Sequence, residues 1–147
     1  MTTNGAPALE AERPRIGRAA YFAAVAVGVL ASLVADTAIS FAARALGAPE
    51  QFQQLGITAY GPITVIAVLV GGIGWRLIVT RTRNAARVLR ILVPVMLVLS
   101  FIPDLALIPS TGGVPGSGTG IAALMAMHLA VTLAAVAAYR RFMPARA

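Results

Sequence analysis

Long apolar runs separated by short polar segments are the main pattern of this sequence. Four of these runs come close to the ~20 residues that a helix needs to cross roughly 30 Å of hydrocarbon. They cover residues 19–41, 60–80, 88–108 and 120–139. Because a backbone inside lipid must satisfy its own hydrogen bonds, each run is predicted to be an α-helix.

The segments between the runs are too short to hold a folded domain. Residues 47–58, 81–87 and 109–120 are predicted connections, and the glycines and prolines of the last one predict a flexible loop. Short connections make neighbouring helices antiparallel, which predicts an all-α, integral membrane four-helix bundle with up-down-up-down topology. Residues 1–18 lack apolar periodicity and are predicted to be a disordered cytoplasmic tail before one domain over residues 19–147.

The charged residues predict the orientation of this bundle. The chain is 59% hydrophobic and 12% charged, and all 12 of its basic residues are arginines. All of them except Arg44 precede the first run, surround the second connection or follow the fourth run. By the positive-inside rule, both termini of this multi-pass protein of the cell membrane are predicted to lie in the cytoplasm. The net charge of +7 is therefore a topology signal and does not indicate nucleic-acid binding.

The first 45 residues allow a second interpretation, as a signal peptide. Residues 43–45 read Ala-Arg-Ala, which fits a cleavage site. The apolar run before it is longer than the usual region of about 7–15 residues in such peptides, and it contains an aspartate. A signal anchor that is retained as the first helix fits better.

Small residues predict the faces on which the helices pack. They recur every four residues along the first run, at Ala20, Ala24, Gly28, Ser32, Asp36 and Ser40. Small side chains let helix backbones approach closely where lipid supplies no hydrophobic driving force. The corresponding residues are Gly71, Gly72 and Gly74 in the second run, and Ala130, Ala134 and Ala138 in the fourth. Alanine-rich faces on more than one side also allow a homodimer.

Asp36, Asp104 and His128 form a candidate polar cluster in the membrane. A charge at the bilayer centre costs at least ~2.5 to 3.5 kcal/mol, so such residues tend to face the bundle and find partners. The helical rise predicts that Asp104 and His128 reach a similar depth in the outer half of the membrane, with Asp36 slightly further out. Three helices thus aim polar groups toward one pocket that opens to the exterior.

Pro103 stands directly before Asp104 and predicts a kink. Proline lacks a backbone N–H and displaces the carbonyl four residues earlier, which here belongs to Leu99. Beside this kink, Asp104 is predicted to join the third and fourth helices by accepting hydrogen bonds from His128, Ser100 or water.

Each of the three residues also has a purely structural interpretation. Asp104 reaches exterior water if the membrane ends near Pro103. Asp36 forms a structural hydrogen bond to Ser32, Ser40 or a facing helix, and His128 is a packed, hydrogen-bonded histidine.

The sequence predicts no catalytic motif, metal site or cofactor site. The chain has no cysteine, which excludes thiolate chemistry. Two carboxylates and one histidine are possible metal ligands, but their spacing matches no known motif. The glycines at positions 71, 72 and 74 follow no strand, so they do not indicate a phosphate-binding loop.

The stretches FIPDLALI at 101–108 and AALMAMHLAV at 122–131, with an aspartate late in the first run, resemble small four-helix membrane proteins of actinobacteria whose function is unassigned. The resemblance implies that Pro103, Asp104 and His128 are recurring polar positions, with Asp36 a weaker match. It implies no activity.

Three functions are compatible with this sequence. The simplest is a non-enzymatic structural or accessory component of the membrane, since it requires only the packing faces. A small proton-linked transporter that uses His128 and Asp104 is the second. The third is an enzyme that acts on a lipid-like substrate with His128 as general base. Expected partners are membrane lipids, a second copy or another membrane protein, and not nucleic acid.

Overall fold

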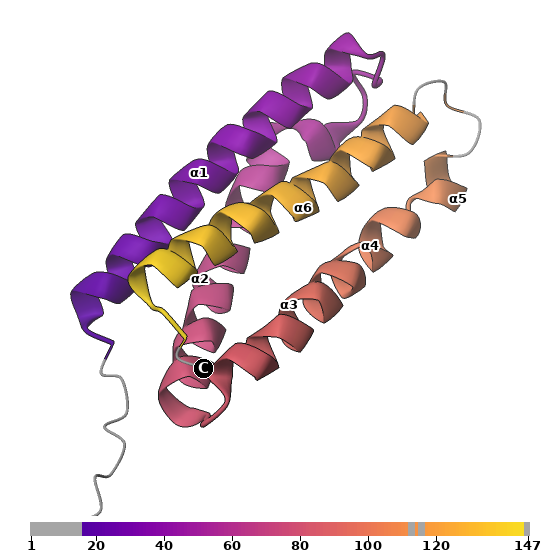
Figure 1. The fold of residues 1–147 in the computed structure, drawn as a ribbon. Helices are drawn as coiled ribbons and strands as arrows, with labels where there is room; N and C mark the ends of the chain where they lie inside the picture. The colour runs from indigo at the N-terminus through magenta and orange to yellow at the C-terminus, as the bar shows by residue number, and fades with distance from the viewer. Residues whose placement is uncertain (1–15, 112–113, 115–116, 146–147) are drawn as a thin grey trace, which may run out of the picture.

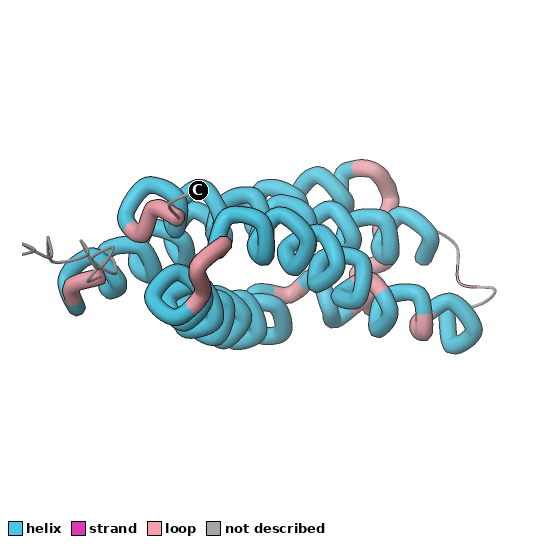
Figure 2. Tube along the Cα trace, turned by 60° about the horizontal axis from the view of Figure 1, so that its bottom comes forward, coloured by secondary structure: helices cyan, strands magenta, loops and turns pink. Residues whose placement is uncertain are grey.

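The computed structural model describes residues 16–111, 114 and 117–145, so most of the predicted tail lies outside the described residues. The described chain is all-α. It contains α1 (Arg18–Ala45), a short 3-10 helix η1 (Gln53–Leu55), α2 (Ile57–Arg81), α3 (Ala85–Ser100), α4 (Ile102–Leu105), α5 (Ile108–Thr111) and α6 (Ser117–Phe142). Figure 2 shows short loops between successive helices from α1 to α4.

Four helical segments are long and apolar enough to cross a membrane, which confirms the predicted class. They are Arg18–Ala45, Ile57–Arg81, Ala85–Leu105 and Ser117–Phe142. Successive segments run in opposite directions, and both ends of the described chain lie at the same end of the bundle (Figure 1). Most of these helices extend a few residues beyond the apolar runs, because a helix continues through the membrane interface.

The central contact of the bundle is between α1 and α6, which lie along each other for most of their length (Figure 1). The predicted small-residue stripe of α1 faces inward, since Ala24, Gly28, Ser32, Asp36 and Ser40 are all buried. Gly28 lies where α1 meets both α2 and α6. A Cβ there would lie 3.1 Å from Val68 Cγ1 of α2 and 3.6 Å from the Ala135 Cα of α6.

The predicted packing ridge of α6 is wrong in part. Of its three alanines, Ala138 is buried, while Ala130 and Ala134 are half-buried. The buried line of this helix instead includes Met127 and Ala135. An α-helix has about 3.6 residues per turn, so a strict four-residue spacing drifts away from the contact line along the helix.

The first connection packs against the bundle instead of forming an open loop. It starts with Gly47, whose φ of 91° ends α1, and the Ala48 N–H donates to the Ala43 carbonyl at 2.9 Å. The side chains of Phe52 and Leu55 are then buried among α1, α2 and α6. These two bulky side chains fill the end of the bundle that is predicted to face the exterior.

The third span differs from the single helix predicted over residues 88–108. It breaks after Ser100 and again after Leu105, giving α3, α4 and α5. Pro103 has no N–H with which to continue the α3 hydrogen bonds, and the Phe101 N–H instead donates to the Val98 carbonyl at 3.2 Å. Pro103 therefore divides the helix and starts a new turn that carries Asp104.

Candidate functional site

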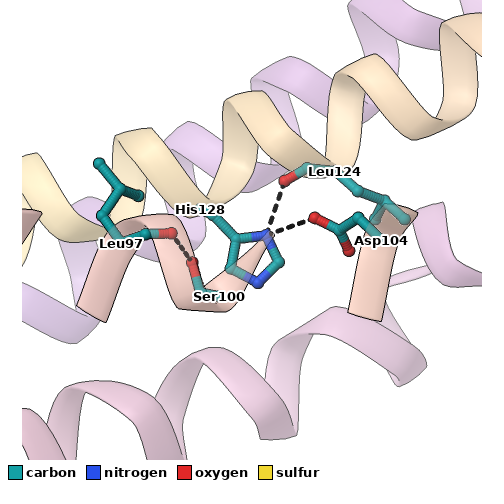
Figure 3. Close-up of polar contacts among 5 residues, drawn as sticks. All are labelled: Leu97, Ser100, Asp104, Leu124 and His128. Atoms are coloured by element: carbon teal, nitrogen blue, oxygen red, sulfur yellow. Dashed lines mark hydrogen bonds and ion pairs between the residues drawn. The ribbon is translucent and has the colours of Figure 1, made fainter. Parts of the chain in front are cut away.

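Asp104 and His128 lie in contact across the third and fourth spans. The break before α4 turns the Asp104 side chain toward α6, where His128 Nδ1 lies 3.0 Å from Asp104 Oδ2 (Figure 3). The Asp104 side chain is 8% exposed and that of His128 is 34% exposed. Asp104 and His128 form an ion pair when His128 is protonated.

The surroundings of His128 determine which ring nitrogen carries the first proton. Nδ1 lies 2.9 Å from the Leu124 carbonyl oxygen as well as close to Asp104. Both neighbours accept hydrogen bonds, so a proton on Nδ1 is the arrangement that satisfies them. One N–H cannot point directly at two oxygens, which explains why Asp104 Oδ2 is among the buried atoms without a well-directed hydrogen bond. The Nε2 atom points away from both acceptors (Figure 3).

Two nearby residues complete the surroundings of this pair. The Phe101 ring meets the imidazole edge-on, with 6.2 Å between ring centroids. Ser100 Oγ donates to the Leu97 carbonyl at 2.6 Å (Figure 3), so Ser100 serves its own helix and is not a donor to Asp104.

Asp36 forms a separate contact between α1 and α2. Its side chain is completely buried, and Thr64 Oγ1 donates to Asp36 Oδ2 at 2.7 Å. The other oxygen, Oδ1, has no hydrogen-bond partner, and neither does Ser32 Oγ one turn earlier on the same face. An ionised carboxylate accepts several hydrogen bonds, so this one is only partly satisfied.

The structure thus brings two of the three candidate residues together and pairs the third elsewhere. Asp36 has no direct contact with Asp104 or His128 among the described hydrogen bonds and ion pairs. The partner that sequence reasoning missed is Thr64. The sequence contains one signal for Thr64, since Tyr60, Thr64, Val68 and Gly72 recur every four residues and so share one face of the helix. The structure shows that all four are buried.

These contacts supply hydrogen bonds between helices. Within the described ranges, no three His, Asp or Glu side chains lie close enough together to hold a metal ion. Nε2 of His128 is left for a further hydrogen-bond partner while Nδ1 stays with its two acceptors. Asp36 and Thr64, for their part, join two helices through one short hydrogen bond.

Four apolar helices with buried polar contacts between them define a class, the multi-pass α-helical membrane proteins. Within this class, the chain belongs to the Family of unknown function (DUF6069), whose family model matches residues 13–145. No curated protein and no solved structure matches the chain. The family match agrees with the resemblance to membrane proteins of unassigned function.

Proposed function

We propose that this protein is a non-enzymatic structural or accessory component of the cytoplasmic membrane. The observation that carries the proposal is that each ionisable side chain inside the bundle contacts another helix. Asp104 meets His128 across α4 and α6, and Asp36 meets Thr64 across α1 and α2. Polar contacts of this kind hold transmembrane helices together, which gives these costly residues a role without chemistry. On this proposal its partners are membrane lipids and a second copy or another membrane protein.

Proton flux and stability together test this proposal. The wild-type chain and the variants Asp104→Asn and His128→Ala are reconstituted in liposomes that contain a pH-sensitive dye, and their thermal unfolding is measured. We expect no wild-type flux above that of empty liposomes and a lower melting temperature for both variants. Glu50→Gln is the matched control, because Glu50 is an exposed carboxylate in the first connection. Wild-type flux that disappears in a stably folded variant would overturn the proposal.

The proposal includes an orientation with both termini in the cytoplasm. Arginines at the start of α1, in the α2–α3 connection and at the end of α6 share one end of the bundle (Figure 1). Arg44 lies at the other end. Arginine is strongly biased toward the cytoplasmic side of membrane proteins, which supports this orientation.

A proton-linked transporter is the second candidate, and one observation favours it. Ser32 Oγ and Asp36 Oδ1 are buried without hydrogen-bond partners. Each unsatisfied buried polar atom costs about 1 to 3 kcal/mol, and an internal water or a shared proton would remove that cost. This candidate predicts wild-type flux that Asp36→Asn abolishes and Glu50→Gln preserves. The absence of wild-type flux would exclude it.

A further inference from the structure

A half-apolar pocket lies at the arginine-rich end of the bundle. It has a volume of about 280 Å³ and is bordered by α2, α3, α6 and the residues after α6. The end of the described chain lies beside the start of α3 (Figure 1). The residues that line the pocket are Trp75, Ala86, Leu89, Arg90, Arg140, Pro144 and Ala145.

One wall of the pocket is held in place by Trp75. Its indole Nε1 donates to the Met143 carbonyl at 2.9 Å, and the Met143 side chain is completely buried. The Met143 N–H donates to the Tyr139 carbonyl at 2.7 Å. These contacts fold the chain back over α2 after α6 ends, so Pro144 and Ala145 form a wall facing α3.

The two arginines of the pocket have no acidic partner in the described part of the chain. The carboxylates found there belong to Asp36, Glu50 and Asp104, which lie in the opposite half of the bundle or in its first connection. Arg90 and Arg140 are exposed, come from different helices and meet at one concavity. Among the described residues, no carboxylate lies beside these two guanidinium groups, and paired guanidinium groups of this kind are suited to bind an anion.

Arg76 shows that arginines at this end do not all serve the same purpose. Its Nη2 donates to the Ile16 carbonyl at 3.2 Å, and its guanidinium lies 5.7 Å from the centre of the Tyr21 ring. It therefore fastens the start of α1 to α2. For Arg90 and Arg140, which line the pocket, no such contact is found among residues 16–111, 114 and 117–145.

We propose that this pocket binds the phosphate group of an anionic phospholipid. Arg90 lies in the second turn of α3, about 8 Å from the start of the helix, which is the depth of headgroups and glycerol in a bilayer. Both guanidinium groups offer paired N–H donors to phosphate oxygens. Trp75, Leu89 and Pro144 cover the glycerol and the first methylenes of the acyl chains. Basic pockets between transmembrane helices on the cytoplasmic side recognise such headgroups.

The size of the pocket decides between a headgroup and a whole lipid. Sites for drug-sized ligands measure about 300 to 1,000 Å³, and this pocket of about 280 Å³ falls just below that range. It therefore holds a headgroup and its glycerol, while the acyl chains remain in the bilayer. A zwitterionic headgroup carries a cationic group next to its phosphate, and the two arginines of the pocket repel it. Net negative charge of the headgroup is therefore the selected property.

The test uses the full chain in nanodiscs made of phosphatidylcholine with increasing phosphatidylglycerol. The fluorescence of Trp75, the only tryptophan of the chain, reports occupancy of the pocket, and native mass spectrometry counts retained lipids. The variant Arg90→Gln/Arg140→Gln is compared with Arg87→Gln/Arg141→Gln. The control pair removes the same charge from neighbouring exposed positions that do not line the pocket. Circular dichroism verifies that each variant is folded.

We expect the pocket pair to lose about fivefold in apparent phosphatidylglycerol affinity per arginine, and the control pair to lose clearly less. The Trp75 signal should respond to phosphatidylglycerol in the wild type and in the control pair only. Equal losses of affinity in both pairs would mean that the arginines attract anionic lipid only through the general charge of the surface. This result would overturn the proposal. A Trp75 response to inorganic phosphate in pure phosphatidylcholine discs would assign the pocket to a free anion and also overturn it. Either result leaves the proposed structural function untouched, because that function depends on the other half of the bundle.

Discussion

Single hydroxyl and carboxyl groups fix how the helices of this protein meet. Asp36 accepts from Thr64, while Ser40 of the same stripe donates to the Leu55 carbonyl at 2.7 Å. Thr37 and Tyr60 share a hydrogen bond of 2.9 Å between the same two helices. Hydrogen bonds between membrane helices contribute about 0.6 kcal/mol on average and up to about 1.7 kcal/mol. Several of them along one face therefore set the register of α1 on α2.

Replacing Thr64 by valine should destabilise the protein. Valine preserves the shape of the side chain but leaves Asp36 without its hydrogen-bond donor, and an unsatisfied buried acceptor costs about 1 to 3 kcal/mol. We expect a decrease of that size in the free energy of unfolding, measured by denaturant titration in mixed micelles. Thr64→Ser, which restores the hydroxyl, should recover most of the loss.

Thr58→Val is the matched control for this experiment, because Thr58 is exposed on the same helix. Its effect should stay within about 0.5 kcal/mol. If Thr64→Val and Thr58→Val have the same effect, the Asp36–Thr64 hydrogen bond does not join α1 to α2.

The sequence identifies the candidate residues better than it identifies their partners. Asp36, Asp104 and His128 stand out because ionisable groups are expensive inside an apolar run. A hydroxyl costs much less there, so Thr64 does not stand out by its chemistry and is visible only from the four-residue spacing of α2. For Asp104, the sequence offered three donors, and only the rotation of the α4 turn selects His128.

At the scale of elements, the length of the apolar runs and the spacing of small residues predict more of the fold than the composition of the connections does. The four spans and the buried stripe of α1 follow directly from them. The first connection reads as a polar loop, because its two core residues, Phe52 and Leu55, are separated by glutamines and show no regular period. The break at Pro103 was predicted only as a kink, since a proline inside a span is also compatible with a continuous helix. Pro94 in α3 is such a case.

Gly28→Val should push α1 away from α2 and α6. A Cβ at this position already lies 3.1 Å from Val68 Cγ1, and the larger side chain would meet the α6 backbone as well. Overpacking of this kind costs about 1 to 3 kcal/mol. We expect a corresponding loss in the free energy of unfolding, measured in the same micelles.

Gly74→Val is the control for the helix contact. A Cβ at residue 74 meets nothing within 4 Å, so the same substitution should be tolerated there. A Gly28→Val variant that is as stable as Gly74→Val would show that α1 and α6 do not approach each other closely at this point.

For the whole molecule, the distribution of arginine predicts which end of the bundle enters the cytoplasm. We expect a fusion of green fluorescent protein to the C-terminus to fluoresce, because this reporter folds in the cytoplasm but does not become fluorescent after export through the general secretion route. Alkaline phosphatase at the same position should be inactive. When it is inserted in the first connection, after Glu50, the phosphatase should instead be active. The reverse pattern would place the termini outside and would contradict the positive-inside assignment.

The proposed structural role requires above all that the buried ionisable residues hold the helices together. A double-mutant cycle on Asp104→Asn and His128→Ala, read out as free energy of unfolding in phospholipid micelles, tests it most directly. Residues in contact show interaction energies of about 0.5 to 3 kcal/mol in such cycles, and we predict a value in this range. Additive losses, or single variants as stable as the wild type, would contradict the claim.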